Sequence, residues 1–86
     1  MSVEISSEWV NEGDALRRSV TCATFMGAIE LVDLVAIAAE EMDHHPDMDI
    51  RWRTVTFVLS THSAGTITDL DFQLAQRIDA LIVAQN

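Results

Sequence analysis

Glu40-Glu41-Met42-Asp43-His44-His45-Pro46 holds two of the three histidines and the only proline of this 86-residue chain. Proline breaks a helix and pushes the residue before it toward an extended backbone. We therefore expect His44 to lie in the last turn of a helix and His45 to be leaving that helix already. His62 is separated from His45 by 16 residues. The rest of the fold is expected to bring it back to the same place.

A helix is expected before this segment, from about Thr24, which can cap it, to Asp43 or His44. Apolar residues recur there at spacings of three and four, which predicts one apolar stripe. The predicted stripe comprises Phe25, Ile29, Val32, Ala36, Ala39 and Met42. Leu31, Val35 and Ala38 widen it, so we expect the helix to be covered on more than one side.

A strand region is expected after the segment, from Ile50 to Thr61, with a loop at residues 47–49. Within it, apolar and polar residues alternate, which is typical of a strand with one buried face. The positions on that face are Val55, Phe57, Leu59 and Thr61. A turn near Arg51 to Arg53 would split the region into two antiparallel strands, and the sequence leaves both arrangements open.

Two more elements complete the chain. Glu12-Gly13-Asp14 is a turn signal between Trp9-Val10 and the run from Leu16 to Cys22, which predicts a hairpin whose second strand lies at a sheet edge. Thr68 is expected to cap a final helix, with Asp71 at the capping-box position. The apolar stripe of this helix comprises Leu70, Leu74, Ile78, Leu81 and Ile82, with Phe72, Ala75 and Val83 off the stripe.

The order strand-strand-helix-strand-strand-helix favours an α+β fold. We expect one domain over residues 1–86, built as a four-stranded antiparallel sheet with both helices packed on one face. In that arrangement the end of the first helix meets the end of the last long strand, which brings the three histidines together. The off-stripe apolar residues of both helices predict a homodimer or homotetramer.

The composition excludes several partners. A net charge of −9, with five arginines and no lysine, argues against nucleic acid and against an anionic membrane. Cys22 is the only cysteine and cannot form an intrachain disulfide, which indicates a buried thiol in a reducing compartment. No apolar run approaches the length of a membrane span. The sequence therefore predicts a cytoplasmic protein.

Several anchored positions together resemble the signature of the pterin-4a-carbinolamine dehydratase family, the 4a-hydroxytetrahydrobiopterin dehydratases. These positions are Glu40, His44-His45-Pro46, Trp52, His62 and Asp71, and the resemblance runs from about Trp9 to about Ile82. It implies a cytoplasmic hydro-lyase with an α+β fold. Such an enzyme removes water from a 4a-hydroxytetrahydropterin and returns a quinonoid dihydropterin, the recyclable cofactor of aromatic amino acid hydroxylases.

Two positions depart from that family. Its members usually begin with a further helix, and here about eight residues precede Trp9, which bears on oligomer contacts rather than on the site. Some members carry an arginine just before the aspartate that aligns with Asp71. Leu70 stands there in this chain, so one polar contact of the site is missing or replaced.

The expected chemistry needs one proton delivered to the leaving hydroxyl and one removed from a ring nitrogen. Histidine titrates near neutrality and suits both tasks. We assign His44 and His62 as the acid/base pair and His45 to substrate contact and orientation. Glu40 is expected to orient His44 or to hold a pterin nitrogen. The negative helix end and this carboxylate both favour the protonated form of His44.

The remaining substrate contacts are expected around the histidines. Thr61, Ser63 and Ala64 would line the pocket through backbone groups, and Trp52 would wall the pocket or only pack. Asp71 is a capping carboxylate, a site residue or both. The full substrate-binding set is His44, His45, Pro46, Thr61, His62, Ser63, Ala64, Trp52 and Asp71. The pterin is the substrate, so the reaction needs neither a metal nor a redox cofactor.

Three alternatives stand beside this interpretation. His44 alone can serve as a cap for the helix dipole. Three histidines with carboxylates can bind zinc, although adjacent histidines do not easily point at one ion. The scaffold can also serve as an assembly factor or protein-binding partner of a larger enzyme, with a hydroxylase or an assembly client as its partner. The short N-terminus, the acidic charge and Leu70 favour that function, and the intact histidine set favours the enzyme.

Overall fold

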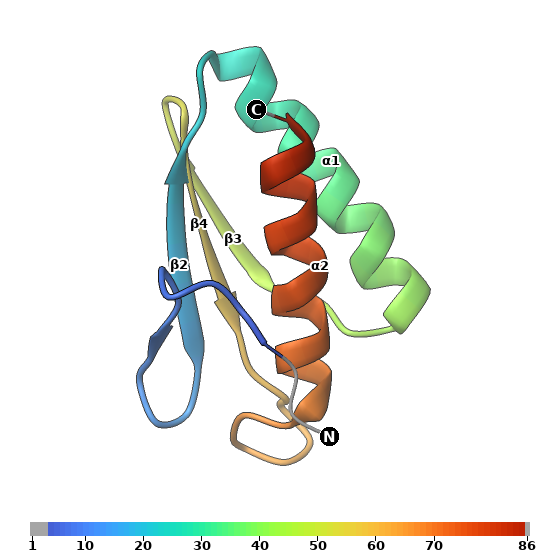
Figure 1. The fold of residues 1–86 in the computed structure, drawn as a ribbon. Helices are drawn as coiled ribbons and strands as arrows, with labels where there is room; N and C mark the ends of the chain where they lie inside the picture. Colours follow the sequence, from blue (N-terminus) through green and yellow to red (C-terminus); the bar gives the residue numbers. More distant parts are fainter. Residues whose placement is uncertain (1–3, 86) are drawn as a thin grey trace.

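A computed structural model describes residues 4–85. Its elements are β1 (Val10–Asn11), β2 (Leu16–Thr21), α1 (Phe25–Met42), β3 (Asp47–Arg51), β4 (Thr54–Leu59) and α2 (Asp69–Gln85). The strands form one antiparallel sheet in the order β1-β2-β4-β3, and both helices cover the same face of it (Figure 1). This confirms the predicted α+β architecture.

The alternation of β4 builds the core. Val55, Phe57 and Leu59 point toward the helices and are at most 1% exposed. Apolar side chains from both helices meet them there, as a period-two strand requires of its inner face: Leu31 and Val35 from α1, and Leu74 and Ile78 from α2. On the outer face the sheet carries paired hydroxyls, Ser19 with Thr56 and Thr21 with Thr54.

The region after Pro46 forms two strands rather than one. Trp52 and Arg53 make the turn, which confirms the predicted split near Arg51 to Arg53. The prediction of a loop at residues 47–49 is wrong, because they belong to β3 and pair with β4 from Asp47 opposite Val58. Two aspartates suit this position, since β3 is the last strand of the sheet and its outer side chains remain in water.

The predicted N-terminal hairpin is confirmed, but its second strand is only partly an edge. β2 pairs with β4 along its whole length, and β1 covers it at Leu16 and Arg17 only. Over the described residues the rest of β2, from Arg18 to Thr21, has no second neighbour. The edge prediction therefore applies to this half alone.

The core face of α1 differs from the predicted stripe. The fully buried positions are Ala28, Leu31, Val35, Ala38 and Ala39. Phe25, first in the predicted stripe, is 50% exposed, and the residues expected only to widen the stripe form the contact with the sheet. Apolar residues surround most of this helix, so periodicity alone could not fix which side faces the sheet. Leu34 and Ile37 remain exposed.

A left-handed residue ends α1, and Pro46 does not. Asp43 has φ of 49°, its N–H donates to Glu40 O (3.2 Å), and the His44 N–H donates to Ala39 O (3.0 Å). This is the Schellman pattern of a helix C-terminus. His44 therefore lies two residues past the helix and not in its last turn, so that prediction is wrong. The turn at Asp43 aims the following chain back toward the sheet.

The start of α2 confirms the predicted capping box in part, because Asp71 Oδ2 accepts the Thr68 N–H at 2.8 Å. The predicted stripe is wrong at one position: Leu70 is 40% exposed. Ala75, predicted off the stripe, is completely buried. Among the described residues, neither helix combines the length and the apolar character needed to cross a bilayer.

Candidate functional site

A hollow of about 390 Å³ opens where α1 ends, β3 begins and β4 ends. Its lining contains all three histidines, so the predicted convergence is confirmed. The lining residues are Asp43, His44, His45, Pro46, Asp47, Ser60, Thr61, His62, Ser63 and Leu70. Three separate segments, residues 43–47, residues 60–63 and Leu70, thus build one site.

His44 is held by a buried carboxylate. Its Nε2 lies 2.5 Å from Asp71 Oδ1, and the two side chains are 9% and 0% exposed. An ionised carboxylate only accepts hydrogen bonds, so Nε2 carries the hydrogen. The other nitrogen of the ring, Nδ1, makes no hydrogen bond within residues 4–85. In a neutral ring with this tautomer, Nδ1 is the atom that takes up a proton.

Asp71 is itself fixed by donors on its other oxygen. Oδ2 accepts the hydroxyl of Thr61 and the backbone N–H of Thr68, both at 2.8 Å. The Thr61 hydroxyl has only one hydrogen, so the Thr68 hydroxyl, 2.7 Å away, donates to it. The carboxylate also lies in the first turn of α2, where the helix dipole favours a negative charge. These hydrogen bonds and the helix dipole offset the free-energy cost of burying the charged carboxylate.

Glu40 contacts a different histidine from the one predicted. Its Oε2 lies 2.5 Å from Nε2 of His45, and both side chains are largely exposed. The assignment of Glu40 to His44 is wrong because the turn at Asp43 directs His44 inward and leaves His45 on the side of the helix that carries Glu40. Each of the two adjacent histidines therefore has its own carboxylate.

His62 also lines the hollow, in the turn that follows β4. The Gly65 N–H donates to His62 O, and Thr61 pairs with Thr66 across this turn. The imidazole is exposed and makes no hydrogen bond within the described part of the chain. It therefore differs from His44, whose ring is buried and anchored.

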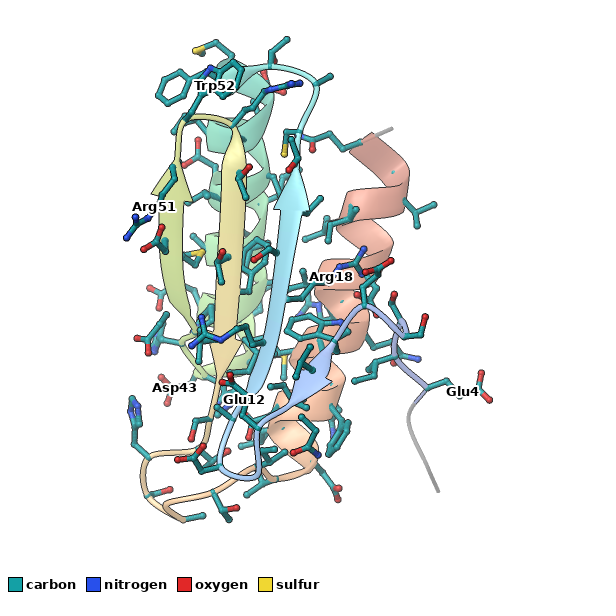
Figure 2. The ribbon with its side chains drawn as sticks, turned by 90° about the vertical axis from the view of Figure 1, so that its left-hand side faces the viewer. Glu4, Glu12, Arg18, Asp43, Arg51 and Trp52 are labelled. Carbon is teal, nitrogen blue, oxygen red and sulfur yellow. The ribbon has the colours of Figure 1, made fainter. Side chains whose placement is uncertain are left out.

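Two predicted pocket residues lie elsewhere. Trp52 is at the far end of the sheet from Asp43 (Figure 2), where it is 74% exposed and stacks on Arg53 at 4.6 Å. Its prediction as a pocket wall is wrong, because β3 begins at the hollow with Asp47 and reaches this turn only after Arg51. Ala64 also lies outside the lining, since its N–H donates to Thr61 O inside the turn.

Sequence reasoning missed three lining residues, Asp43, Asp47 and Ser60. The two aspartates bracket the His-His-Pro segment, and this adjacency was the available signal. Asp71, the partner of His44 in the structure, was predicted as a capping carboxylate, a site residue or both, but nothing in the spacing connected it with His44. Within residues 4–85, no three His, Cys, Asp or Glu side chains converge as metal ligands do.

Comparison with protein families places the chain among known sequences. A family model described as Pterin 4 alpha carbinolamine dehydratase matches residues 2–81. A relative from Mycobacteroides abscessus with a provisional pterin-4-alpha-carbinolamine dehydratase name is 61% identical over 74 residues, which cover 86% of this chain and 79% of the relative. A relative from Nocardia farcinica with the same provisional name is 58% identical over 74 residues, with coverage of 86% and 78%.

Solved structures share the fold. A crystal structure described as a transcriptional coactivator/pterin dehydratase from Brucella melitensis superposes with a TM-score of 0.82 at 31% identity, covering 87% of this chain and 82% of that chain. A pterin dehydratase-like protein identified as a RuBisCO assembly factor in the alpha-carboxysome gives a TM-score of 0.73 at 21% identity, with coverage of 86% and 88%. At that identity the second likeness concerns the fold alone.

Proposed function

Because this chain belongs to the pterin-4-alpha-carbinolamine dehydratase family, we propose that it is a hydro-lyase that removes water from a 4a-hydroxytetrahydropterin and releases a quinonoid dihydropterin. The observation that carries the proposal is the hollow whose lining contains both a buried, anchored histidine and an exposed one. The product of this reaction is the oxidised pterin that a reductase returns to the tetrahydro form, so the proposed role is recycling of the cofactor of aromatic amino acid hydroxylases.

The reaction needs two proton transfers. The bond between C4a and the hydroxyl oxygen breaks, and the hydroxyl takes a proton and leaves as water. The electron pair of the neighbouring nitrogen forms a C4a=N5 double bond, which places a positive charge on the ring. A proton then leaves a ring nitrogen for a base, and the neutral quinonoid product remains. One acid and one base suffice, and each contributes roughly 10² to 10⁴ in rate.

We assign these transfers to His44 and His62. The Nε2–H of His44 is committed to Asp71, so Nδ1 is the atom that exchanges a proton with the substrate. His62 is in contact with solvent and can regain or release a proton after each turnover. His45, paired with Glu40, contacts and orients the ring. These tasks need only proton transfer, so no resident metal or redox cofactor is part of the proposal.

The test is dehydration of chemically prepared 4a-hydroxytetrahydropterin, followed by absorbance. The wild type is compared with His44→Ala and His62→Ala, and with Trp52→Ala as a matched control, because Trp52 is aromatic and exposed but remote from the hollow. We expect fast turnover that falls roughly 10²-fold or more in both histidine variants and persists in the control. Wild-type turnover no faster than the uncatalysed reaction would rule the proposal out.

A second function, in assembly or protein binding, is supported only by a likeness of fold. The RuBisCO assembly factor shares the fold of this chain at 21% identity, and its role is that protein's own. An assembly or protein-binding role for this chain therefore becomes the next hypothesis only if turnover is absent. A pull-down with the tagged protein then looks for the client.

We also propose that the protein works in the cytoplasm and as a homo-oligomer. The single buried Cys22 favours a reducing compartment. The exposed apolar side chains of both helices, such as Leu34, Ile37 and Val83, favour association between copies. Light scattering tests the second point, and a monomeric mass would contradict it.

A further inference from the structure

The charge of the hollow limits which pterins it can accept. Asp43 and Asp47 line it together with the three histidines, and its lining contains no Arg or Lys. Within the described residues, neither aspartate forms an ion pair. Their carboxylates thus remain unneutralised at the mouth of the site.

Protonation of the histidines does not make the net charge of the hollow positive. His44 is paired with Asp71, and His45 is paired with Glu40, so protonation of either ring only neutralises a pair that is already present. His62 is the remaining group that can bring a positive charge. Four carboxylates therefore face at most three imidazolium rings. The site is net negative at every degree of histidine protonation while its carboxylates are ionised.

The two arginines of an adjacent hollow are already paired with carboxylates. A neighbouring hollow on the outer face of the sheet shares Asp47 with the site and contains Arg17 and Arg51. Arg17 is paired with Glu12 at 3.2 Å, and Arg51 is paired with Asp49 at 3.2 Å. Arg51 also lies far from Asp43 along the sheet (Figure 2). A substrate tail that runs from the site over Asp47 therefore meets no free guanidinium on this path.

We propose that Asp43 and Asp47 make the enzyme selective for pterins with an uncharged substituent at C6 and discriminate against those with a phosphate or carboxylate tail. This inference rests on the proposed dehydratase function and specifies its substrate class. Like charges repel a ligand at distances up to the Debye length, about 10 Å at 0.1 M salt. The repulsion applies to the tail, whereas the charge that develops on the reacting ring is positive and common to all pterins.

The test uses three matched substrates: the 4a-hydroxy derivatives of 6-hydroxymethyl-tetrahydropterin, of its phosphate ester and of its acetate ester. The acetate enlarges the substituent without adding charge, so it separates size from charge. We expect the wild type to turn over the alcohol and the acetate with similar kcat/KM and the phosphate roughly tenfold less efficiently at low salt. Raising the salt concentration should narrow this difference.

The variant Asp43→Asn/Asp47→Asn should narrow the ratio of kcat/KM between alcohol and phosphate by roughly threefold to tenfold. The control Glu8→Gln/Asp33→Asn removes two exposed acidic charges outside the lining and should leave the ratio unchanged. If the two aspartates also affect the reacting ring, they change kcat/KM for the alcohol and for the phosphate by the same factor, and the ratio of the two values removes that factor.

Equal efficiency with alcohol and phosphate in the wild type would overturn the inference, as would a ratio that the double variant leaves unchanged. Discrimination against the acetate as strong as that against the phosphate would also overturn it, because size would then be the cause. Failure of the proposed function gives a different result, since the alcohol itself would then react no faster than without protein.

Discussion

Asp71 has two partners that belong to different parts of the molecule. One oxygen holds the ring of His44, and the other caps α2 through Thr68. A carboxylate that is completely buried is costly unless each oxygen is satisfied, and here three donors satisfy it. In the proposed mechanism Asp71 therefore acts on catalysis through the tautomer of His44, and it acts on stability through the start of α2.

Replacing Asp71 with Asn separates these two effects. The amide is nearly isosteric and can still accept from Thr68, but its NH₂ group presents a donor to His44 and favours the wrong tautomer. We expect kcat to fall roughly 10²- to 10⁴-fold, while the far-ultraviolet circular dichroism of the folded protein is retained. The pH–rate profile should also lose the limb that depends on His44.

Asp69→Asn is the matched control for this variant, because Asp69 is an exposed acid in the same helical turn and lies outside the hollow. Its kcat should remain near that of the wild type. If Asp71→Asn also kept full activity with an unchanged pH–rate profile, Asp71 would have no part in positioning His44.

Cys22 gives a second prediction for a single residue. Burial raises the pKa of its thiol, and the side chain is 5% exposed with Sγ 3.7 Å from Gln85 Oε1. The reactive thiolate is therefore scarce in the folded protein at pH 8. We expect Ellman's reagent to modify it much more slowly in buffer than in concentrated urea, and equal rates would contradict a buried thiol.

The raised pKa of the Cys22 thiol also makes the free energy of unfolding depend on pH. A raised pKa in the folded state means that the contribution of Cys22 is complete below the pKa of the unfolded thiol, about 8.5, and is lost as the pH rises above it. Urea denaturation between pH 7 and 10 should show this loss in the wild type. It should be smaller in Cys22→Ala, which removes the thiol.

The sequence predicted which residues line the hollow better than it predicted which carboxylate contacts which histidine. The three histidines, Pro46 and Thr61 all line one hollow, as expected from their spacing along a helix, a turn and a strand. The assignment of Glu40 as the partner of His44 was wrong because one left-handed residue, Asp43, directs His44 away from Glu40. Such a rotation depends on a single φ angle, which the composition of the segment does not encode.

At the scale of the elements, the end of α1 is the most informative feature. Asp43 adopts φ of 49°, a conformation that favours glycine over residues with a side chain. Asp43→Gly should therefore stabilise the protein by about 0.5–1 kcal/mol, measured as the free energy of unfolding in urea.

Asp43→Ala is the control, because alanine removes the carboxylate but keeps the Cβ that disfavours this conformation. We expect it to be no more stable than the wild type. If both variants changed stability equally, the carboxylate rather than the backbone conformation would be the cause.

The pattern of apolar and polar residues predicted some helices and strands better than others. β4 was predicted because its inner and outer faces meet such different surroundings that polar and apolar residues must alternate. The first half of β3 was missed because an exposed edge strand tolerates Asp47 and Asp49, which resemble loop residues. The orientation of α1 was missed because Leu34 and Ile37, although apolar, remain exposed, so the helix presents more than one candidate core face.

At the scale of the whole molecule, one carboxylate ties the N-terminal part to α2. Asp79 accepts from Trp9 Nε1 and Ser6 N, both at 2.7 Å, and from Arg18 Nη1 at 2.5 Å. Arg18 Nε is buried without a partner in the described structure, so this guanidinium depends on Asp79. Segments about 60 to 70 residues apart in sequence are joined there.

Asp79→Ala should destabilise the fold by about 2 kcal/mol, because it leaves Arg18 partly buried with no counter-charge. Differential scanning calorimetry measures the change. The double variant Arg18→Met/Asp79→Ala should recover part of the loss, since it removes the unpaired charge. A single variant as stable as the wild type would mean that the ion pair contributes nothing.

Because Asp71 contacts His44 and also caps α2, its presence in a related sequence does not by itself indicate an active enzyme. A descendant that abandoned catalysis would still need Asp71 and Thr68 to begin α2, so these residues would survive natural selection as structural relics. The imidazole of His62 makes no hydrogen bond within residues 4–85, and His62 is not part of the core cluster. In the proposed mechanism its imidazole serves only the reaction, so the loss of His62 in a lineage would be the first sign that the reaction had been abandoned.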